Sequence, residues 1–455
     1  MVSAFDLPLE ILIPKITNDS SISDRVIETA ISRYREHEET LCAYRHWSPA
    51  SNDKPGILSG IPVSIKDLFG LNGFETYAGT PRPLPKKWCF EGEVVHSLRN
   101  AGAVFMGKTH MVEFAFGGLG TNPHWPTPVN PWSIDEPHVS GGSSSGSGVS
   151  IQEGSALAAL GSDTAGSVRV PASFTGTVGV KTTKNRWSTN GLVPLSHSLD
   201  TPGIITRSVS DAVVMFSVID PETNIPFDQF LMNLRSQDVV GLKMGICSWF
   251  FDGCDTNIGE VALRATGAIE KRGASASEVS PRAISEAGEI FSRGGLAASE
   301  FAELINTEFP DWKDTLDPNV KSRFEKMANI SASDYDDRLQ RSTLLAKEID
   351  QTLADVDVLV GPTVPISPPT ILEVTEPQLY RQLNMRALRN TSIVNLLDLC
   401  AITIPVGLDA KGFPVGLQFI GRKGEDEKLL TVALAAERTL GSASELMGKA
   451  PLVID

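Results

Sequence analysis

The sequence predicts an α/β domain with a mixed β-sheet, and three observations lead to this class. Short apolar runs alternate along the chain with longer segments of helical periodicity. A Gly- and Ser-rich stretch, 140–150, stands between apolar core segments, where a flexible linker would be out of place. No internal repeat is found. Strands that alternate with helices are typical of a sheet covered by helices.

The first expected helix covers residues 23–40, because the apolar residues from Val26 to Ile31 recur at helical spacing. Ser23 is its expected N-cap, with Ser21 as the alternative. A buried strand is then expected to end just before Lys66.

That strand is expected over 62–65, where apolar residues follow a Gly- and Pro-broken segment. A helix over 94–100 and a second strand over 103–107 come next. The stretch 140–150 predicts a tight loop that enters a helix, followed by the apolar segment 156–161.

Residues 220–350 are richer in charge and in helix-forming residues than the rest of the chain. Helices are expected over 258–272 and 331–353, so we expect a helical region laid over the sheet. Strand patterns then return over 355–361 and 400–406.

Composition narrows the function classes. The chain has 455 residues, 41% of them hydrophobic, which is ordinary for a globular protein with a large core. Its formal charge is −15 and it has no basic run, so we expect no nucleic-acid partner. The sequence shows no apolar run of about 18 residues, so no membrane span is expected. The five cysteines form no C-x-x-C pair and the seven histidines show no metal-ligand spacing. We therefore expect a cytoplasmic protein without metal or cofactor.

Lys66 is a candidate base. It follows the strand pattern of 60–65, and lysines are rarely buried unless they are paired. Burial lowers the pKa of a lysine, which lets the neutral amine accept a proton near neutral pH. The alternative is a surface lysine that begins a loop.

Two further segments offer hydroxyl groups. The Ser/Gly segment 141–148 could relay a proton, and its glycines allow another loop to approach closely. In 161–171, the small residues before Ser167 suit a turn whose N–H groups converge as an oxyanion site requires. Asp163 and Arg169 flank that turn and could pair across it. The alternative for this element is a surface turn with an incidental salt bridge.

A Ser-His-Asp triad is the competing arrangement. Residues Gly142 to Gly146 match the G-x-S-x-G elbow formally, but the segment before them does not resemble the strand that this elbow requires. His138 and His197 are the nearest histidine candidates, and neither stands in a persuasive local context.

Taken together, these motifs resemble the amidase signature family. Residues 141–171 follow the Ser/Gly-rich signature nearly position by position, including the spacing between Ser143 and Ser167. Residues 60–67 look like the lysine motif of the family, and 357–363 and 412–418 look like its later blocks. The resemblance covers nearly the whole chain.

The resemblance implies a role for each matching residue. Ser167 would be the nucleophile, Ser143 the bridging serine with a cis peptide bond to Gly142, and Lys66 the base. The N–H groups of the turn would form the oxyanion hole, and neighbouring residues would support the site. The hole would comprise Thr164, Ala165, Gly166 and Ser167, and the supporting residues would be Gly142, Ser144, Asp163 and Arg169.

The family also implies one large domain over 1–455, with a mixed central sheet covered by helices on both faces. Within it, 220–350 would be a variable helical region that sets substrate specificity. The implied function is hydrolysis of a small carboxylic amide, with release of ammonia or an amine. The partner would be the small-molecule substrate, and a homodimer is left open.

The sequence departs from the commoner family pattern at several positions. His110 and Val112 stand where members that act with tRNA tend to have Asn and Asp. Other departures are Gln152, Glu153 and Thr182. The departures at His110 and Val112 count against a tRNA-linked member and so favour a free-standing hydrolase. The alternatives are the glutaminase component of a tRNA-dependent amidotransferase, an allophanate-hydrolase-like enzyme suggested by 390–400, and a binding module without activity.

Overall fold

The fold is built on one mixed β-sheet, seen in a computed structural model that describes residues 4–50, 54–255, 257–327 and 330–454. In this part of the chain the sheet has 11 strands in the order β1-β3-β2-β4-β6-β5-β10-β11-β9-β7-β8. The strands are β1 (Tyr44–Ala50), β2 (Pro62–Lys66), β3 (Val104–Thr109), β4 (Ala158–Asp163), β5 (Val178–Lys181), β6 (Thr201–Thr206), β7 (Lys243–Cys247), β8 (Ser275–Val279), β9 (Val358–Pro362), β10 (Cys400–Leu408) and β11 (Pro414–Gly421).

The α-helices of the described residues lie between these strands along the chain. They are α1 (Leu9–Asn18), α2 (Ser21–Leu41), α3 (Glu93–Asn100), α4 (Ser145–Glu153), α5 (Arg169–Thr175), α6 (Val209–Ile219), α7 (Phe227–Arg235), α8 (Ser248–Phe251), α9 (Ile258–Glu270), α10 (Arg282–Ser292), α11 (Ala297–Glu308), α12 (Pro318–Met327), α13 (Ala332–Thr352), α14 (Pro377–Leu396), α15 (Asp426–Leu440) and α16 (Ala443–Met447). None of these helices has the length and apolar character needed to cross a lipid bilayer.

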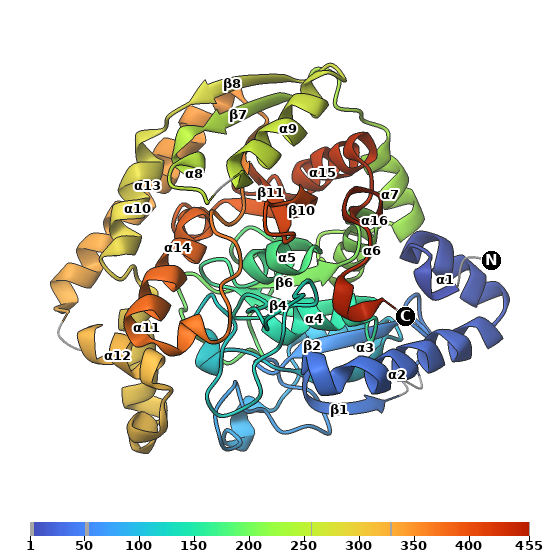
Figure 1. Cartoon of the computed structure of the whole chain (residues 1–455), viewed down its shortest axis with the longest axis horizontal. Coiled ribbons are helices and arrows are strands. Elements are labelled where there is room, and N and C mark those ends of the chain that lie inside the picture. The colour runs from blue at the N-terminus through green and yellow to red at the C-terminus, as the bar shows by residue number, and fades with distance from the viewer. Residues whose placement is uncertain (1–3, 51–53, 256, 328–329, 455) are drawn as a thin grey trace.

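Helices cover both faces of the sheet, as expected for the predicted α/β class (Figure 1). Helices α6, α15 and α9 contact one another in series and pack against one face. Helices α4 and α5 contact each other and pack against the other. Every residue of β2, β3 and β4 is buried, which explains why their sequences are mostly apolar or small and do not alternate between apolar and polar residues; the charged Lys66, Lys108 and Asp163 stand at or near the strand ends.

The direction of the strands brings the candidate residues together. Strand β2 is parallel to both β3 and β4, and Ile65 pairs with Leu160 of β4. Because parallel strands end at the same edge of a sheet, Lys66 and Asp163 both lie at this edge. The strand predicted over 62–65 is confirmed, and it extends one residue further to include Lys66 itself.

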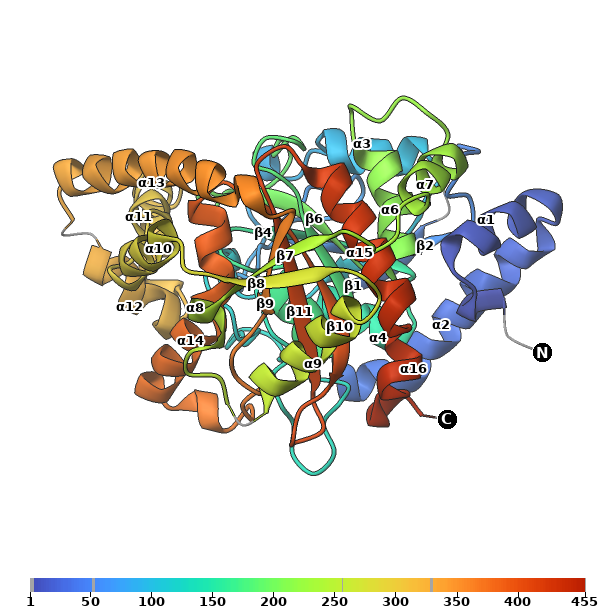
Figure 2. The same ribbon diagram turned by 90° about the horizontal axis from the view of Figure 1, so that it is seen from above.

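Residues 220–350 depart in part from the expected helical cover. Helices α10 to α13 gather at one end of the molecule, far from α1, in both views (Figures 1 and 2). However, the same region contributes β7 and β8, which extend the sheet beyond β9 in parallel. The region expected to be helical is therefore mostly helical in the part of the chain that the structure describes, but it also adds two strands to the sheet. Strand β8 is mostly exposed and polar, so its sequence, Ser275–Val279, carries little strand signal.

The N-terminal helices also differ from the prediction. Helix α1 was not predicted; it contains Pro14, and its apolar face buries Leu9 and Leu12. Helix α2 begins at Ser21, so Ser23 lies inside it and does not cap it. The Ser21 N–H instead bonds to the Asp19 carboxylate at 3.0 Å, which removes the need for a serine cap.

Candidate active site

Lys66 is fully buried at the end of β2. Its Nζ lies 2.7 Å from Ser143 Oγ and 2.9 Å from Ser162 Oγ. Burial lowers the pKa of Lys66 to about 7, although the carboxylates of Asp163 and Asp200 act in the opposite direction. The alternative of a surface lysine is therefore wrong.

The loop before α4 presents Ser143 to Lys66. The peptide bond between Gly142 and Ser143 is cis. The Ser143 carbonyl accepts the Val112 N–H at 3.2 Å, and Ser144 is the N-cap residue of α4. A Cβ at Gly142 would lie 2.7 Å from the backbone nitrogen of Gly120, so only glycine fits there. The segment is therefore the tight loop entering a helix that the sequence predicts.

The turn that carries Ser167 connects β4 to α5 and is closed by a buried ion pair. Asp163 and Arg169 are both fully buried, and their side chains share two hydrogen bonds of 3.0 and 3.1 Å. Burial alone would raise the pKa of Asp163, but Arg169 holds the pKa of this carboxyl at about 2. The two residues are paired as the sequence suggested, in the protein interior instead of on the surface.

The loops of the two serines are also bonded to each other. The Ser144 N–H donates to the Ser167 carbonyl at 3.2 Å. On the other side of the turn, Thr391 Oγ1 donates to the Ala165 carbonyl at 2.7 Å. These bonds fix the backbone of the Ser167 turn between α4 and α14.

One member of the expected oxyanion set is engaged elsewhere. The Gly166 N–H donates to Asp163 Oδ1 at 2.9 Å. A cavity of ≈ 240 Å³ adjoins the turn, and Thr164, Ala165 and Ser167 line it, whereas Gly166 does not. The candidate N–H donors for an oxyanion in the cavity are therefore those of Thr164, Ala165 and Ser167, without that of Gly166.

Sequence reasoning missed three polar residues that support these groups. Ser162 is the second hydroxyl at Lys66, and it could have been noticed because it lies next to Asp163 in the motif. Asp200 accepts the Thr164 hydroxyl at 2.6 Å, and Asn395 bonds to both Asp163 and Arg169. Asp200 and Asn395 lie 36 and 232 residues from Thr164 and Asp163, so no local pattern could have indicated them.

The histidines of the competing triad lie outside the cavity. His138 bonds to the Glu136 carbonyl, away from Ser167. The His197 side chain is 67% exposed and lies near Glu300. Neither residue lines the cavity that contains Ser167. The described residues contain no group of three or more His, Cys, Asp or Glu side chains suited to a metal ion.

The wall of the cavity opposite Ser167 comes mainly from α10, α11, α12 and α14. It is largely apolar, with Phe116, Phe291, Met385 and Leu388 among its residues. Two arginines, Arg323 and Arg381, are part of the same lining. The cavity has room for a small organic substrate next to the Ser167 hydroxyl.

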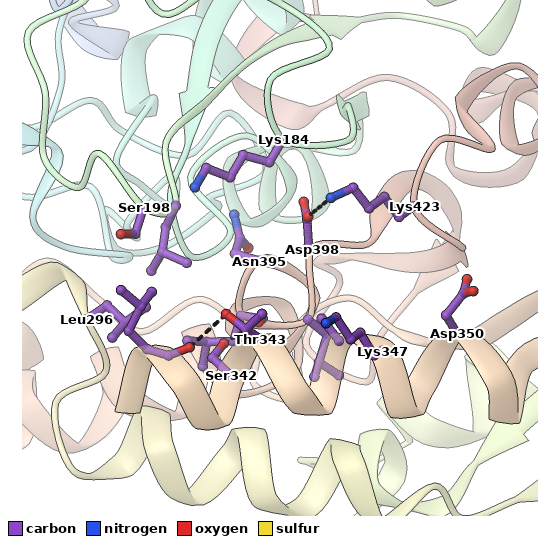
Figure 3. A pocket seen from close by; sticks show the side chains of 15 residues that line it. Lys184, Ser198, Leu296, Ser342, Thr343, Lys347, Asp350, Asn395, Asp398 and Lys423 are labelled. Carbon is purple, nitrogen blue, oxygen red and sulfur yellow. Dashed lines mark hydrogen bonds and ion pairs between the residues drawn. The ribbon is translucent and has the colours of Figure 1, made fainter. Parts of the chain in front are cut away.

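A second cavity of ≈ 350 Å³ adjoins the first (Figure 3). The two share Leu199, Leu296 and Leu396 as a common wall. Figure 3 shows Lys347 on helix α13 below and Lys184 above, with Lys423 bonded to Asp398 at 2.6 Å. The rim of this second cavity is polar, whereas the cavity at Ser167 is largely apolar.

The structure thus places Ser167 at the edge of a small cavity, with the buried Lys66 at the end of a neighbouring strand of the mixed sheet. The family model named Amidase matches residues 24–430, and the chain belongs to this family. It is a hydrolase that acts on C–N bonds.

The chain is similar to several known proteins over most of its length. It is 42% identical to 2-amino-5-chloromuconic acid deaminase of Comamonas testosteroni, over 93% of this chain and 94% of that protein. It is 30% identical to indoleacetamide hydrolase of Pseudomonas savastanoi, over 86% of each chain. A crystal structure of an amidase superposes with a TM-score of 0.82 at 28% identity and covers 96% of this chain and 100% of that one.

Proposed function

We propose that this amidase hydrolyses the C–N bond of a small carboxylic amide through a covalent acyl-enzyme on Ser167, with Lys66 as the base and Ser143 as the proton relay. The observation that carries the proposal is the 2.7 Å contact between Lys66 Nζ and Ser143 Oγ in a fully buried site. The depressed pKa of Lys66 supports it, because a neutral amine can accept a proton at pH 7.

The proposed reaction begins with three coupled transfers. Neutral Lys66 takes the proton of the Ser143 hydroxyl, which takes the proton of Ser167, and Ser167 Oγ forms a bond to the amide carbon. The carbonyl oxygen becomes an oxyanion, which we assign to the N–H groups of Thr164, Ala165 and Ser167.

Collapse of the tetrahedral intermediate then breaks the C–N bond. The proton returns from Lys66 through Ser143 to the leaving nitrogen, which departs as ammonia or an amine. Water next attacks the acyl-enzyme with the same relay as base, which releases the carboxylic acid and restores Ser167. These steps need only the side chains and N–H groups named here.

We favour a free-standing hydrolase over a component of a tRNA-dependent amidotransferase. The supporting observations are the net charge of −15, the departures at His110 and Val112, and a cavity that the chain lines by itself. The five free cysteines favour a cytoplasmic location. A homodimer is left open beside the monomer.

The 42% identical relative favours a second candidate function. Its name gives it deamination of an amino-substituted unsaturated acid. Such a reaction also breaks a C–N bond, but its nitrogen is an amino substituent and not a carboxamide nitrogen, so the acyl-enzyme steps above apply only to the amide.

Labelling with a fluorophosphonate probe tests the proposal. Mass spectrometry should find the probe on Ser167, with complete loss of ammonia release from a panel of aliphatic, aromatic, ureido and glutamine amides and amino-substituted unsaturated acids. Thiol reagents and EDTA should have little effect. A label on another residue, inactivation by EDTA, or activity that needs partner proteins and tRNA would contradict it.

A further inference from the structure

The cavity at Ser167 is positively charged in a strongly acidic protein. Its lining includes Arg323 and Arg381 and, among the described residues, no aspartate or glutamate. The chain as a whole carries a formal charge of −15. An apolar cavity of ≈ 240 Å³ would hold a neutral amide without any arginine, so the two guanidinium groups need a separate explanation.

Arg323 lies on α12 with part of its guanidinium unused. Nη1 donates to the Phe116 carbonyl at 3.0 Å, and the group lies 5.0 Å from the centre of the Phe116 ring. Nη2 is buried and has no hydrogen-bond partner. Burial is the main cause that lowers the pKa of Arg323, and the neighbouring Arg381 acts in the same direction, whereas Tyr380 and Asp317 act in the opposite direction. Buried arginines are normally paired, because an unpaired charge is costly to desolvate.

Asn384, on α14, has an unused donor in the same lining. It is fully buried, and its Oδ1 accepts the Gly118 N–H at 2.8 Å. Its Nδ2 has no partner. One helix face thus presents Arg381, Asn384 and Leu388 to the cavity at successive turns. Two buried N–H donors without acceptors call for a ligand that supplies acceptor oxygens.

We propose that the substrate of this site carries a carboxylate remote from the C–N bond that is cleaved, and that Arg323 and Asn384 bind this carboxylate while Arg381 attracts it at the exposed rim. The inference rests on the proposed function, which places the reacting carbon at Ser167. A carboxylate fits because its two oxygens can accept from the unpartnered Arg323 Nη2 and from the Asn384 amide N–H at the same time. A neutral, purely apolar side group leaves both donors unsatisfied.

Protection of Ser167 from a neutral fluorophosphonate measures this binding without knowledge of the natural substrate. The probes are malonate, succinate, glutarate and fumarate, each compared with its diamide, which has the same shape and no charge. We expect at least one dicarboxylate to slow labelling at a lower concentration than its diamide, which can enter the cavity as an amide but lacks the charge. Equal protection by acids and diamides, or protection by neither, would overturn the inference.

Substitutions of single arginines then test which residues bind the carboxylate. In Arg323→Gln and Arg323→Lys the dissociation constant of the protecting dicarboxylate should rise on the order of 10- to 100-fold, and in Arg381→Gln by less. Arg293→Gln is the matched control, because this arginine is 72% exposed and does not line the cavity. The inference fails if all four variants bind alike.

The labelling rate without any ligand separates the two proposals. It should stay near wild type in Arg293→Gln, since this exposed residue has no part in the proton relay or in the cavity. If wild-type Ser167 does not react with the probe, the proposed function fails. Isothermal titration with the same dicarboxylates would then still decide whether Arg323 binds an anion.

Discussion

The two sides of the Ser167 cavity differ in how their buried polar groups are satisfied. On the side of the serine loops, Lys66, Asp163 and Arg169 are fully buried and each is bonded to at least two partners. On the facing side, Arg323 and Asn384 each keep a buried donor without a partner. On the side of the serine loops, these buried polar groups thus have hydrogen-bond partners without a ligand, as a preorganised reaction centre requires. On the facing side, a ligand would have to supply hydrogen-bond acceptors for the two unpaired donors.

The largest loss of activity is expected for Lys66→Ala, because this substitution removes the proposed base from the wall of the cavity that the serine loops form. The turnover number should fall by about 10² to 10⁴, the range typical of a lost general base. Steady-state release of ammonia from the best amide of the panel measures it, with Lys184→Ala in the neighbouring cavity as the control. Near-normal turnover in Lys66→Ala would show that the assigned base is wrong.

Asp163→Asn should destabilise the fold and the Ser167 turn together. It leaves Arg169 buried without its carboxylate, and breaking a buried ion pair costs about 3–5 kcal/mol of unfolding free energy. Chemical denaturation measures this loss. Glu289→Gln, which breaks the exposed pair with Arg293, is the control and should have little effect. A stable Asp163→Asn protein would mean that the ion pair does not hold the turn.

The pH profile of kcat/KM should report Lys66. Because the active form is deprotonated, activity should rise with pH, reach half its maximum near the Lys66 pKa of about 7, and then level off. The Asp200 carboxylate raises the pKa of Lys66, so Asp200→Asn should move this limb to lower pH by less than about one unit. Asp200 itself has a pKa raised to about 6 by burial. If the acidic limb of the profile moved to higher pH in Asp200→Asn, the assignment of this limb to Lys66 would be contradicted.

The smallest change in stability and turnover is expected at the contact between helices α11 and α13 and the segment that contains Ser198. Glu300 on α11 accepts from the hydroxyl of Tyr335 at 2.8 Å and from the Ser198 N–H at 3.1 Å. Tyr335→Phe removes the bond to Glu300 and the long 3.4 Å contact of the same hydroxyl with Ser198 Oγ, so stability should fall by about 1 kcal/mol. Turnover should change by less than about threefold, because the lost bond lies away from the reacting atoms. A much larger loss of turnover would mean that α13 positions the Ser167 turn.

Much of the reaction centre could be predicted, because its residues belong to short motifs. Ser143, Asp163, Ser167 and Arg169 all lie in one segment of the chain, where the local pattern allows a loop, a turn and a pair, and the resemblance to the amidase signature implies their roles. Lys66 could be predicted because it ends a buried strand. Gly166 shows the limit of this reasoning, since the direction of its N–H depends on the position of the Asp163 carboxylate.

The facing wall could not be predicted to the same extent. Arg323 and Asn384 lie on helices whose sequences show ordinary helical periodicity, and nothing local marks them as cavity residues. Strand β8 was missed for a similar reason, because an exposed edge strand has no apolar alternation. The positions of Arg323, Asn384 and strand β8 are set by contacts between segments that are distant in the sequence.

The sequence by itself determined the α/β class, the order of the central elements and the identity of the serines and lysine at the candidate reaction centre. Local patterns suffice for these because backbone hydrogen bonding and short motifs act between near neighbours in the chain. Only the tertiary structure decided that Lys66 meets Ser162 as well as Ser143, and that Asp200 and Asn395 support the turn. It also decided which arginines face Ser167. Burial and charge at these positions arise from packing between segments up to 232 residues apart, and no local pattern records such packing.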